Sequence, residues 1–194
     1  MNRIHIINFL AEKIRAKDYL ELGVSRGICF ARINVENKIG VDIKTHNAVR
    51  GGNVTHVMTS DDFFEQNDKK FDLIFVDGLH VEEQVKRDIL NSVECLNDGG
   101  YIVCHDMSPK SEEKQNDPPE WNGTCWRAWV RIRSERDDLD MSVVDVDQGC
   151  GVITKNASQK LIINEDLTWK NLVKNRKEWL NLVSVEKFRK EHGE

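Results

Sequence analysis

The chain has 194 residues, of which 39% are hydrophobic and 31% are charged. This length suits one compact domain, and the composition excludes both a membrane protein and a disordered chain of low hydrophobicity. With 28 Lys and Arg against 33 Asp and Glu, the formal net charge is -5, which argues against a dedicated nucleic-acid-binding protein because such proteins need a basic face.

Helical and strand patterns alternate along the first 60 residues. Apolar residues recur at helical spacing over residues 6–14, and a short apolar run at 18–22 follows, which predicts a helix and then a strand. A second strand is predicted at 38–42 and a third at 54–58. The stretch 28–36 is the candidate for a helix between the first two strands.

The clearest strand signal comes next. The nearly continuous β-branched and aromatic run at 71–77 fits a parallel strand that is covered on both faces. Apolar residues then repeat at helical spacing over 81–96, residues 97–100 end that helix, and 101–104 supply another strand. Such β-α units in series are typical of a doubly wound sheet.

The second half of the chain begins with a polar stretch, 108–120, that contains all three prolines. It predicts a long loop, which is either a lid or a solvent-exposed disordered loop. A helix around 126–132 precedes two strands, 141–146 and 151–154, which we expect to pair as an antiparallel hairpin. The apolar pattern over 169–183 predicts a C-terminal helix docked on the domain.

These elements together predict an α/β fold over residues 1–194. We expect one domain with a Rossmann-like, doubly wound, mostly parallel seven-stranded sheet, a C-terminal antiparallel hairpin and a C-terminal helix. A cofactor half is expected at about 1–98, an acceptor and metal half at about 99–156, and a helical tail at 157–194.

The first predicted strand runs into the glycine turn Glu21-Leu-Gly-Val-Ser-Arg-Gly27. Gly23 and Gly27 lack a Cβ, so the backbone there can approach a ligand closely. Glycines in such turns also occur for purely steric reasons, and both interpretations stay open on the turn alone. Asp42 at the end of the second strand favours a ligand, because dinucleotide-type folds place there an acid that accepts hydrogen bonds from ribose hydroxyls.

These residues resemble the first two motifs of the class I S-adenosylmethionine-dependent methyltransferases. The turn matches their acid-x-Gly-x-x-x-Gly motif, and Asp42 matches the acid of their second motif. With only two glycines, a pyrophosphate-binding dinucleotide site is less expected. After the third strand, Ser60 or Asp61 would contact adenine or, in the alternative interpretation, cap a helix. The resemblance implies S-adenosylmethionine as cofactor, bound by Glu21, Gly23, Ser25, Gly27, Asp42, Ser60, Asp61 and Asp77.

Two pairs of carboxylate and imidazole groups follow the fourth and fifth predicted strands. Asp77 and His80 come after the fourth strand, and His105 and Asp106 come after the fifth. The ends of adjacent parallel strands meet at one crevice, so we expect these four groups to lie close together, where they can bind a metal or move a proton. The alternative for each histidine is a buried, hydrogen-bonded position in the core.

This arrangement resembles one subgroup of the same superfamily, the small-molecule and sugar O-methyltransferases of the macrocin and mycinamicin type, together with the related cephalosporin-hydroxylase-like proteins. The resemblance covers roughly residues 19–154. It implies that Asp77, His105 and Asp106 hold a divalent metal ion, Mg, Mn or Fe, and that His80, with Asp77, is catalytic as the general base. His105 replaces an acidic ligand, and imidazole suits manganese, iron or zinc better than magnesium.

Three tryptophans follow the polar loop. Trp121, Trp126 and Trp129 can form an aromatic wall for a sugar or ring substrate, or they can pack a helix onto the sheet. Core packing is the favoured interpretation for Trp129, and both interpretations stay open for Trp121.

The sequence thus predicts an S-adenosylmethionine-dependent methyltransferase that O-methylates a small-molecule or carbohydrate acceptor. The alternatives are a non-catalytic cofactor-binding protein and an iron-dependent hydroxylase-like enzyme. No apolar run approaches the ~18–20 residues that span a bilayer, and the five cysteines contain no C-x-x-C pair. We therefore expect a cytoplasmic protein with reduced thiols and without membrane or nucleic-acid partners, and leave open whether it is a homo-oligomer.

Overall fold

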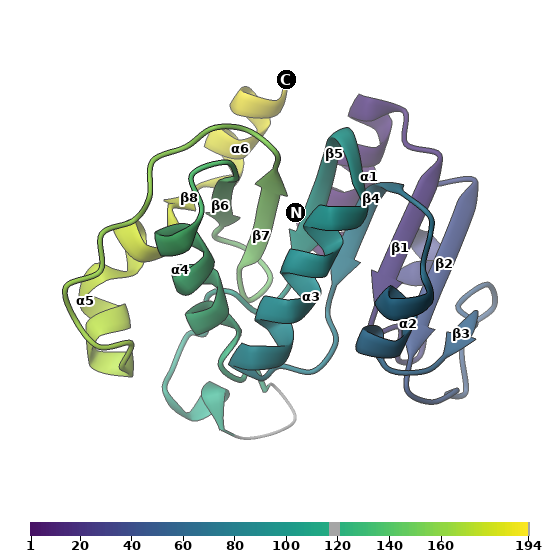
Figure 1. Ribbon diagram of the computed structural model, residues 1–194, viewed down its shortest axis with the longest axis horizontal. Helices are drawn as coiled ribbons and strands as arrows, with labels where there is room; N and C mark the ends of the chain where they lie inside the picture. The colour runs from purple at the N-terminus through teal and green to yellow at the C-terminus, as the bar shows by residue number, and fades with distance from the viewer. Residues whose placement is uncertain (117–120, 194) are drawn as a thin grey trace.

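The computed structural model describes residues 1–116 and 121–193, and these residues form an eight-stranded sheet covered by helices on both faces (Figure 1). The strand order is β3-β2-β1-β4-β5-β7-β6-β8, and within the described chain β7 alone runs antiparallel to its neighbours. The strands are β1 (Asp18–Leu22), β2 (Asn37–Asp42), β3 (His56–Val57), β4 (Phe71–Val76), β5 (Leu96–Cys104), β6 (Asp140–Val144), β7 (Cys150–Thr154) and β8 (Leu182–Val183).

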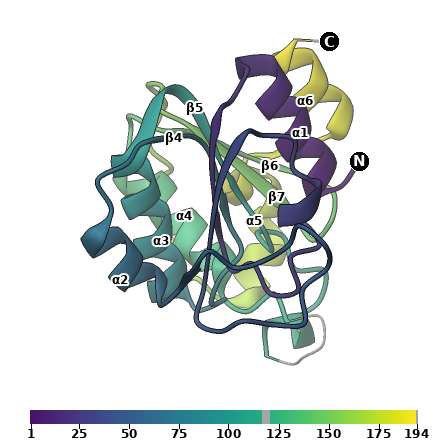
Figure 2. The ribbon, with the colours of Figure 1, turned by 90° about the vertical axis from the view of Figure 1, so that its right-hand side faces the viewer.

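The helices divide between the two faces of the sheet (Figure 2). Apolar side chains of α2, α3, α4 and α5 join one core cluster, whereas those of α1, η1 and α6 join the other. The α-helices are α1 (Arg3–Ile14), α2 (Ser60–Gln66), α3 (Glu82–Cys95), α4 (Cys125–Glu135), α5 (Trp169–Leu180) and α6 (Val185–His192), and the short 3-10 helices are η1 (Phe30–Arg32) and η2 (Glu113–Gln115).

The central strand β4 shows why the run at 71–77 is so uniformly apolar. Its side chains alternate, so that Leu73 and Phe75 enter one core cluster while Ile74 and Val76 enter the other. Each of the four is at most 3% exposed. This burial on both faces is typical of a parallel strand covered by helices. The strand order and directions confirm the predicted mostly parallel, doubly wound sheet with a C-terminal antiparallel hairpin.

Three local predictions differ from the structure. The sheet has eight strands where seven were expected, because the expected C-terminal helix is interrupted after α5. Asn181 adopts a left-handed conformation with φ 46° and donates from Nδ2 to the Met141 carbonyl oxygen at 3.0 Å. The chain then runs as β8 beside β6 before α6 begins. Residues 97–100, expected to end a helix, instead lie within β5, whose pairing with β4 shifts register there.

The helix expected between the first two strands is also absent from the described residues. Within 28–36 only η1 is helical, and Ile33 is already extended with φ -83° and ψ 124°. The Lys38 ammonium donates to the carbonyl oxygens of Phe30 and Ile33 at 2.7 and 3.2 Å, which satisfies acceptors that a continuing helix would have used.

The polar stretch 108–120 is described only in part. Residues 108–116 include η2, whereas 117–120 lie outside the described residues, and so does the question of a lid there. In the described part of the chain, no helix combines the length and the apolar character needed to cross a bilayer.

Candidate active site

The carboxyl ends of the parallel strands gather the predicted site residues at one edge of the sheet. Gly23 follows β1, Asp42 ends β2, and Asp77 follows β4. All three line one cleft, and His105, which follows β5, lies with its Nδ1 atom 3.4 Å from Asp77 Oδ1. The four residues therefore share a common rim, as expected for a sheet of this order.

The cleft has a volume of about 380 Å³ and a largely apolar wall. Ile43 and Leu79 both line the cleft. They are 69% and 53% exposed, although they are large aliphatic side chains. Exposed aliphatic side chains next to a cleft are suited to contact a flat apolar ring. Of the eight residues predicted to bind the cofactor, six line this cleft: Gly23, Ser25, Asp42, Ser60, Asp61 and Asp77.

Glu21 and Gly27 do not line the cleft. Glu21 is 1% exposed and its Oε2 accepts a hydrogen bond from the Tyr19 hydroxyl at 2.5 Å. Burial raises the pKa of Glu21 to about 8. Gly27 packs against Gly52, whose carbonyl oxygen would lie 2.1 Å from a Cβ at position 27. Both residues therefore contact other parts of the protein and not the cleft.

Asp42 is oriented by the glycine turn. Its Oδ2 atom accepts a hydrogen bond from the Ser25 backbone N–H at 2.8 Å, and Oδ1 accepts one from the Lys44 N–H at 3.3 Å. Ser25 adopts a left-handed conformation with φ 49° to make this contact. A carboxylate oxygen accepts more than one hydrogen bond, so Asp42 retains capacity for a ligand hydroxyl.

The far end of the cleft is polar. The N-cap of α2 is Thr59, whose Oγ1 accepts from the Asp62 N–H at 3.1 Å, so neither Ser60 nor Asp61 serves as that cap. Gln84 of α3 also lines the cleft and donates from Nε2 to Ser60 Oγ and to Asp61 Oδ1, each at 3.1 Å. The sequence analysis missed Gln84, because a glutamine inside a helical pattern carries no motif.

Replacing Gly23 with alanine is expected to destabilise the protein and weaken binding in the cleft. Gly23 has φ +84°, and a Cβ there would lie 2.0 Å from the Asp77 carbonyl oxygen. The left-handed conformation costs an alanine about 1–2 kcal/mol, and the collision adds to that cost. Gly99→Ala is the matched control, because Gly99 has φ +76° but no described atom lies within 4 Å of a Cβ there. Equal decreases in melting temperature for the two variants would contradict this packing.

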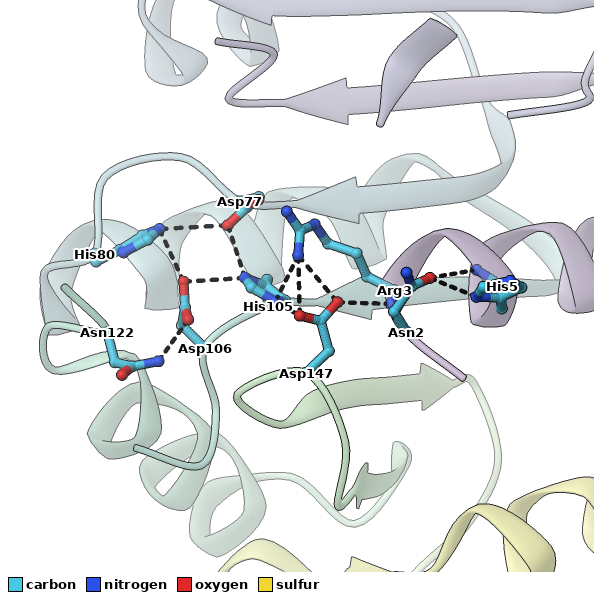
Figure 3. Close-up of polar contacts among 9 residues, drawn as sticks. All are labelled: Asn2, Arg3, His5, Asp77, His80, His105, Asp106, Asn122 and Asp147. Atoms are coloured by element: carbon cyan, nitrogen blue, oxygen red, sulfur yellow. Dashed lines mark hydrogen bonds and ion pairs between the residues drawn. The ribbon is translucent and has the colours of Figure 1, made fainter. Parts of the chain in front are cut away.

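Beside the cleft, four side chains form a ring of alternating carboxylate oxygens and imidazole nitrogens (Figure 3). His80 Nε2 lies 3.4 Å from both Asp77 Oδ1 and Asp106 Oδ2. His105 Nδ1 lies 3.4 Å from Asp77 Oδ1 and 3.1 Å from Asp106 Oδ2. We call Asp77, His80, His105 and Asp106 the Asp-His ring. It unites the two pairs that the sequence placed at the ends of neighbouring strands.

The carboxylates and imidazoles of the Asp-His ring shift one another's pKa values. Burial alone would raise the pKa of Asp77, but the imidazoles of His105 and His80 lower it well below its usual range. Burial alone would lower the pKa of both histidines. The surrounding carboxylates, Asp77 above all, instead raise the pKa of His80 and raise that of His105 well above its usual value. The carboxylates and imidazoles of the ring therefore favour each other's charged forms.

Neighbouring groups fix the orientation of the ring members. His80 Nδ1 lies 2.6 Å from the Trp121 carbonyl oxygen, which can only accept, so Nδ1 donates and Nε2 faces the ring. Asn122 is fully buried and donates from Nδ2 to Asp106 Oδ1. Asp147 Oδ1 lies 3.6 Å from His105 Nε2. Outer partners of this kind orient the ligands of metal sites.

The three tryptophans have different surroundings. Trp126 and Trp129 are fully buried, and Trp126 stacks on Trp179 with ring centroids 6.2 Å apart, so both pack α4 into the core. Trp121 is only partly buried, and its ring lies 5.4 Å from the His80 ring. Trp121 is therefore the member of the three that lies beside the Asp-His ring.

Part of the chain matches a known family model. Residues 20–107 match the family model described as a methyltransferase domain, which ends just after the ring residue Asp106. No curated protein matches the chain.

Solved structures of similar fold include cofactor-bound Rv0187 from MTB, with a TM-score of 0.62 and 17% identity over 80% of each chain. The O-methyltransferase TomG from Streptomyces achromogenes, involved in tomaymycin synthesis and solved with SAM, has a TM-score of 0.61 and 14% identity over 80% of each chain. The SAH-bound methyltransferase PaMTH1 from Podospora anserina has a TM-score of 0.60 and 18% identity, covering 79% of this chain and 78% of that one. At such identities the likeness shows a shared fold.

Proposed function

We infer that this chain, whose residues 20–107 match the model of a methyltransferase domain, is an S-adenosylmethionine-dependent methyltransferase that acts on a hydroxyl group of a small molecule or sugar. The observation that carries the proposal is the juxtaposition of the largely apolar cleft, with Asp42 at its rim, and the Asp-His ring, which share Asp77. The cleft offers a site for a nucleoside, and the ring offers groups that bind a metal or accept a proton.

In the proposed complex, the cleft residues hold the donor. Asp42 accepts hydrogen bonds from the ribose hydroxyls, and Ser60, Asp61 and Gln84 face the adenine at the polar end. The absence of a side chain on Gly23 lets the turn approach the methionine part of the donor. The methyl group then points toward the ring, because Asp77 belongs to both sites.

The ring residues fit a divalent metal ion. Their donor atoms alternate at 3.1–3.4 Å, close to the roughly 3.0–3.4 Å between ligands that are each bound at about 2.1 Å to one ion. With neutral imidazoles, Asp77, Asp106 and Asp147 carry three negative charges against the one positive charge of Arg3, and the resulting charge of -2 matches a divalent ion. We propose Asp77, His105 and Asp106 as its ligands. An imidazole ligand favours manganese, iron or zinc over magnesium.

His80 is proposed as the general base. Its Nδ1 donates a hydrogen bond to the Trp121 carbonyl oxygen, so Nε2 is the nitrogen that accepts a proton. Asp77 and Asp106 face Nε2 and raise the pKa of His80, although burial opposes this shift. Nε2 would take the proton of the acceptor hydroxyl.

Methyl transfer from a sulfonium is an in-line displacement, so the residues contribute mainly by orientation. The cleft fixes the donor, Trp121 offers an aromatic face beside His80 for the acceptor, and His80 removes the hydroxyl proton. A metal ion, when bound, supplies Lewis-acid stabilisation of the developing alkoxide.

The two imidazoles also favour a second candidate, an iron-dependent hydroxylase-like enzyme, because two histidines and a carboxylate are the ligands of many iron oxygenases. Iron-dependent oxygen consumption that does not require S-adenosylmethionine would favour it. The shape of the cleft favours methyl transfer, since an oxygenase needs no nucleoside site. A non-catalytic binding protein would bind the donor but methylate none of a panel of sugar and phenol acceptors.

The first test is calorimetry with S-adenosylhomocysteine, the product form of the donor. The wild-type protein is expected to bind it, and Asp42→Asn is expected to weaken binding roughly 10- to 100-fold, because a charge-assisted bond to the ribose is lost. Asp138→Asn is the matched control, since Asp138 pairs with Arg136 on the surface away from the cleft. Wild-type protein that does not bind S-adenosylhomocysteine would overturn the proposal.

A further inference from the structure

Asp88 lies beneath the polar end of the cleft, on α3 and one turn after Gln84. It is fully buried at the place where α3 packs beside α2 (Figure 2). Its Oδ1 atom accepts hydrogen bonds from Ser60 Oγ at 2.6 Å and from Gln84 Nε2 at 2.9 Å. Within the described chain Asp88 makes no other side-chain hydrogen bond, and both of its donors line the cleft.

A carboxyl group in this position is costly to the fold. Aspartate is rarely fully buried without an ion-pair partner. The Oδ2 atom of Asp88 is buried and has no hydrogen-bond partner among the described residues, and burial raises the pKa of this carboxyl. Oδ2 lies 3.6 Å from the place of a Cβ built on Gly78, which also lines the cleft. Because the contacts of Asp88 lead to cleft residues, we look for its role in the cleft.

The hydrogens of the two neighbouring side chains are already used. A serine hydroxyl has one hydrogen, and Ser60 donates it to Asp88. The amide of Gln84 has two, which are shared among Asp88 Oδ1, Ser60 Oγ and Asp61 Oδ1. Arg87 donates to Gln84 Oε1, which agrees with this orientation of the amide. Neither Ser60 nor Gln84 therefore has a free side-chain hydrogen to offer a ligand.

The side chains at the polar end of the cleft consequently present acceptors. Ser60 Oγ and Gln84 Oε1 keep lone pairs, and the carboxylate oxygens of Asp61 can only accept. A ring with an exocyclic amino group can donate to such atoms. A ring with a carbonyl oxygen in the same place would meet acceptors alone, and its oxygen would stay unpaired.

We propose that Asp88 is a positioning residue that sets the ring specificity of the cleft: by holding the hydrogens of Ser60 and Gln84, it makes the polar end accept an amino group and reject a carbonyl oxygen. The ligand class is a nucleoside whose ring carries an exocyclic amino group, as adenine does. The proposal rests on the proposed function, since it takes the nucleoside of the methyl donor as the ligand of the cleft. Asp88 acts through the two side chains and does not itself touch the ligand.

Calorimetry with S-adenosylhomocysteine and with S-inosylhomocysteine, which has a carbonyl oxygen in place of the amino group, measures this preference. The wild-type protein is expected to bind S-adenosylhomocysteine roughly 10- to 100-fold more tightly. Asp88→Ala should lower the preference about fivefold or more, because Ser60 and Gln84 become free to donate to the carbonyl oxygen. Asp88→Asn keeps an acceptor oxygen for both and should retain the wild-type preference. If Asp88→Ala does not fold, Asp88→Ser replaces it, since its hydroxyl ends one bond short of the carboxylate oxygens.

Two further variants separate this role from a merely structural one. In protein that carries Ser60→Ala, Asp88→Ala should change the preference by at least about twofold less than it does in wild type, because one of the hydrogens that it releases is absent. Ser92→Ala is the matched control. Ser92 is buried on α3 one turn after Asp88, its hydroxyl has no hydrogen-bond partner in the described chain, and it does not line the cleft. This variant should keep the full preference.

The possible results distinguish the failure of this proposal from the failure of the proposed function. If wild type binds S-adenosylhomocysteine but does not prefer it, or if Asp88→Ala weakens both ligands equally, the role of Asp88 is overturned and the proposed function stands. The same holds if Asp88→Asn loses the preference as fully as Asp88→Ala does. If the wild-type protein binds neither nucleoside, the proposed function fails, and the role of Asp88 fails with it.

Discussion

Asp106→Asn is expected to reduce the affinity for Mn²⁺ by about 100-fold or more, while the affinity for S-adenosylhomocysteine changes less than about twofold. Asp106 Oδ2 faces both imidazoles of the Asp-His ring, whereas Asp106 does not line the cleft. Loss of an outer hydrogen-bond partner already costs a metal site about 10–100-fold, and loss of a charged ligand costs more. Titration with Mn²⁺ and with S-adenosylhomocysteine, each by calorimetry, measures both affinities.

Asp145→Asn is the matched control, because Asp145, between β6 and β7, pairs with Lys110 at the surface. It should leave both affinities unchanged. Mn²⁺ binding that survives in Asp106→Asn would show that the ring does not hold the ion. If Asp106→Asn melts at the wild-type temperature but also loses S-adenosylhomocysteine binding, the cleft and the Asp-His ring would not be separate binding sites.

Glu21→Gln is expected to stabilise the protein progressively, relative to wild type, as the pH rises. Burial raises the pKa of Glu21 to about 8 from its ordinary 4.5. Between these pH values the folded protein keeps a proton that the unfolded chain has released, so the wild-type free energy of unfolding falls through this window and levels off above it. Glutamine, a neutral isostere, avoids this loss, which is on the order of a few kcal/mol.

Urea unfolding of both proteins at several pH values between 4.5 and 9 measures the effect as the difference between their free energies of unfolding. The comparison removes the contribution of the ring histidines, which titrate in both proteins. Glu36→Gln, at an exposed position, should track wild type throughout. A constant difference between Glu21→Gln and wild type over this range would contradict the protonated state of Glu21.

The sequence predicted the parallel sheet and the edge that carries the site because both depend on local patterns. Buried strands appear as apolar runs such as 71–77, and residues that follow parallel strands meet at one edge, which is how Asp42, Asp77 and His105 could be placed together. The position of Glu21 departs from this reasoning. Its position in the motif indicated a ligand contact, but the alternation of β1 places its side chain in the interior beside Tyr19.

Other parts of the site lie beyond any local pattern. Arg3 and Asp147 are 144 residues apart, and Asn122 reaches Asp106 from a loop, so only the tertiary structure brings them to the ring. Asp147 lies in a turn whose composition predicted the hairpin but not a contact with His105. The missing helix at 28–36 has a similar origin, because a contact from Lys38 outweighs the helical pattern.

A crystal structure of the protein grown with S-adenosylhomocysteine and Mn²⁺ tests the account most directly. It should show the adenosine in the cleft with its ribose on Asp42, and an anomalous manganese peak bound by Asp77, His105 and Asp106. A nucleoside bound elsewhere on the molecule, or a cleft filled by the side chains of Ile43 and Leu79 with no ligand density under saturating conditions, would contradict it.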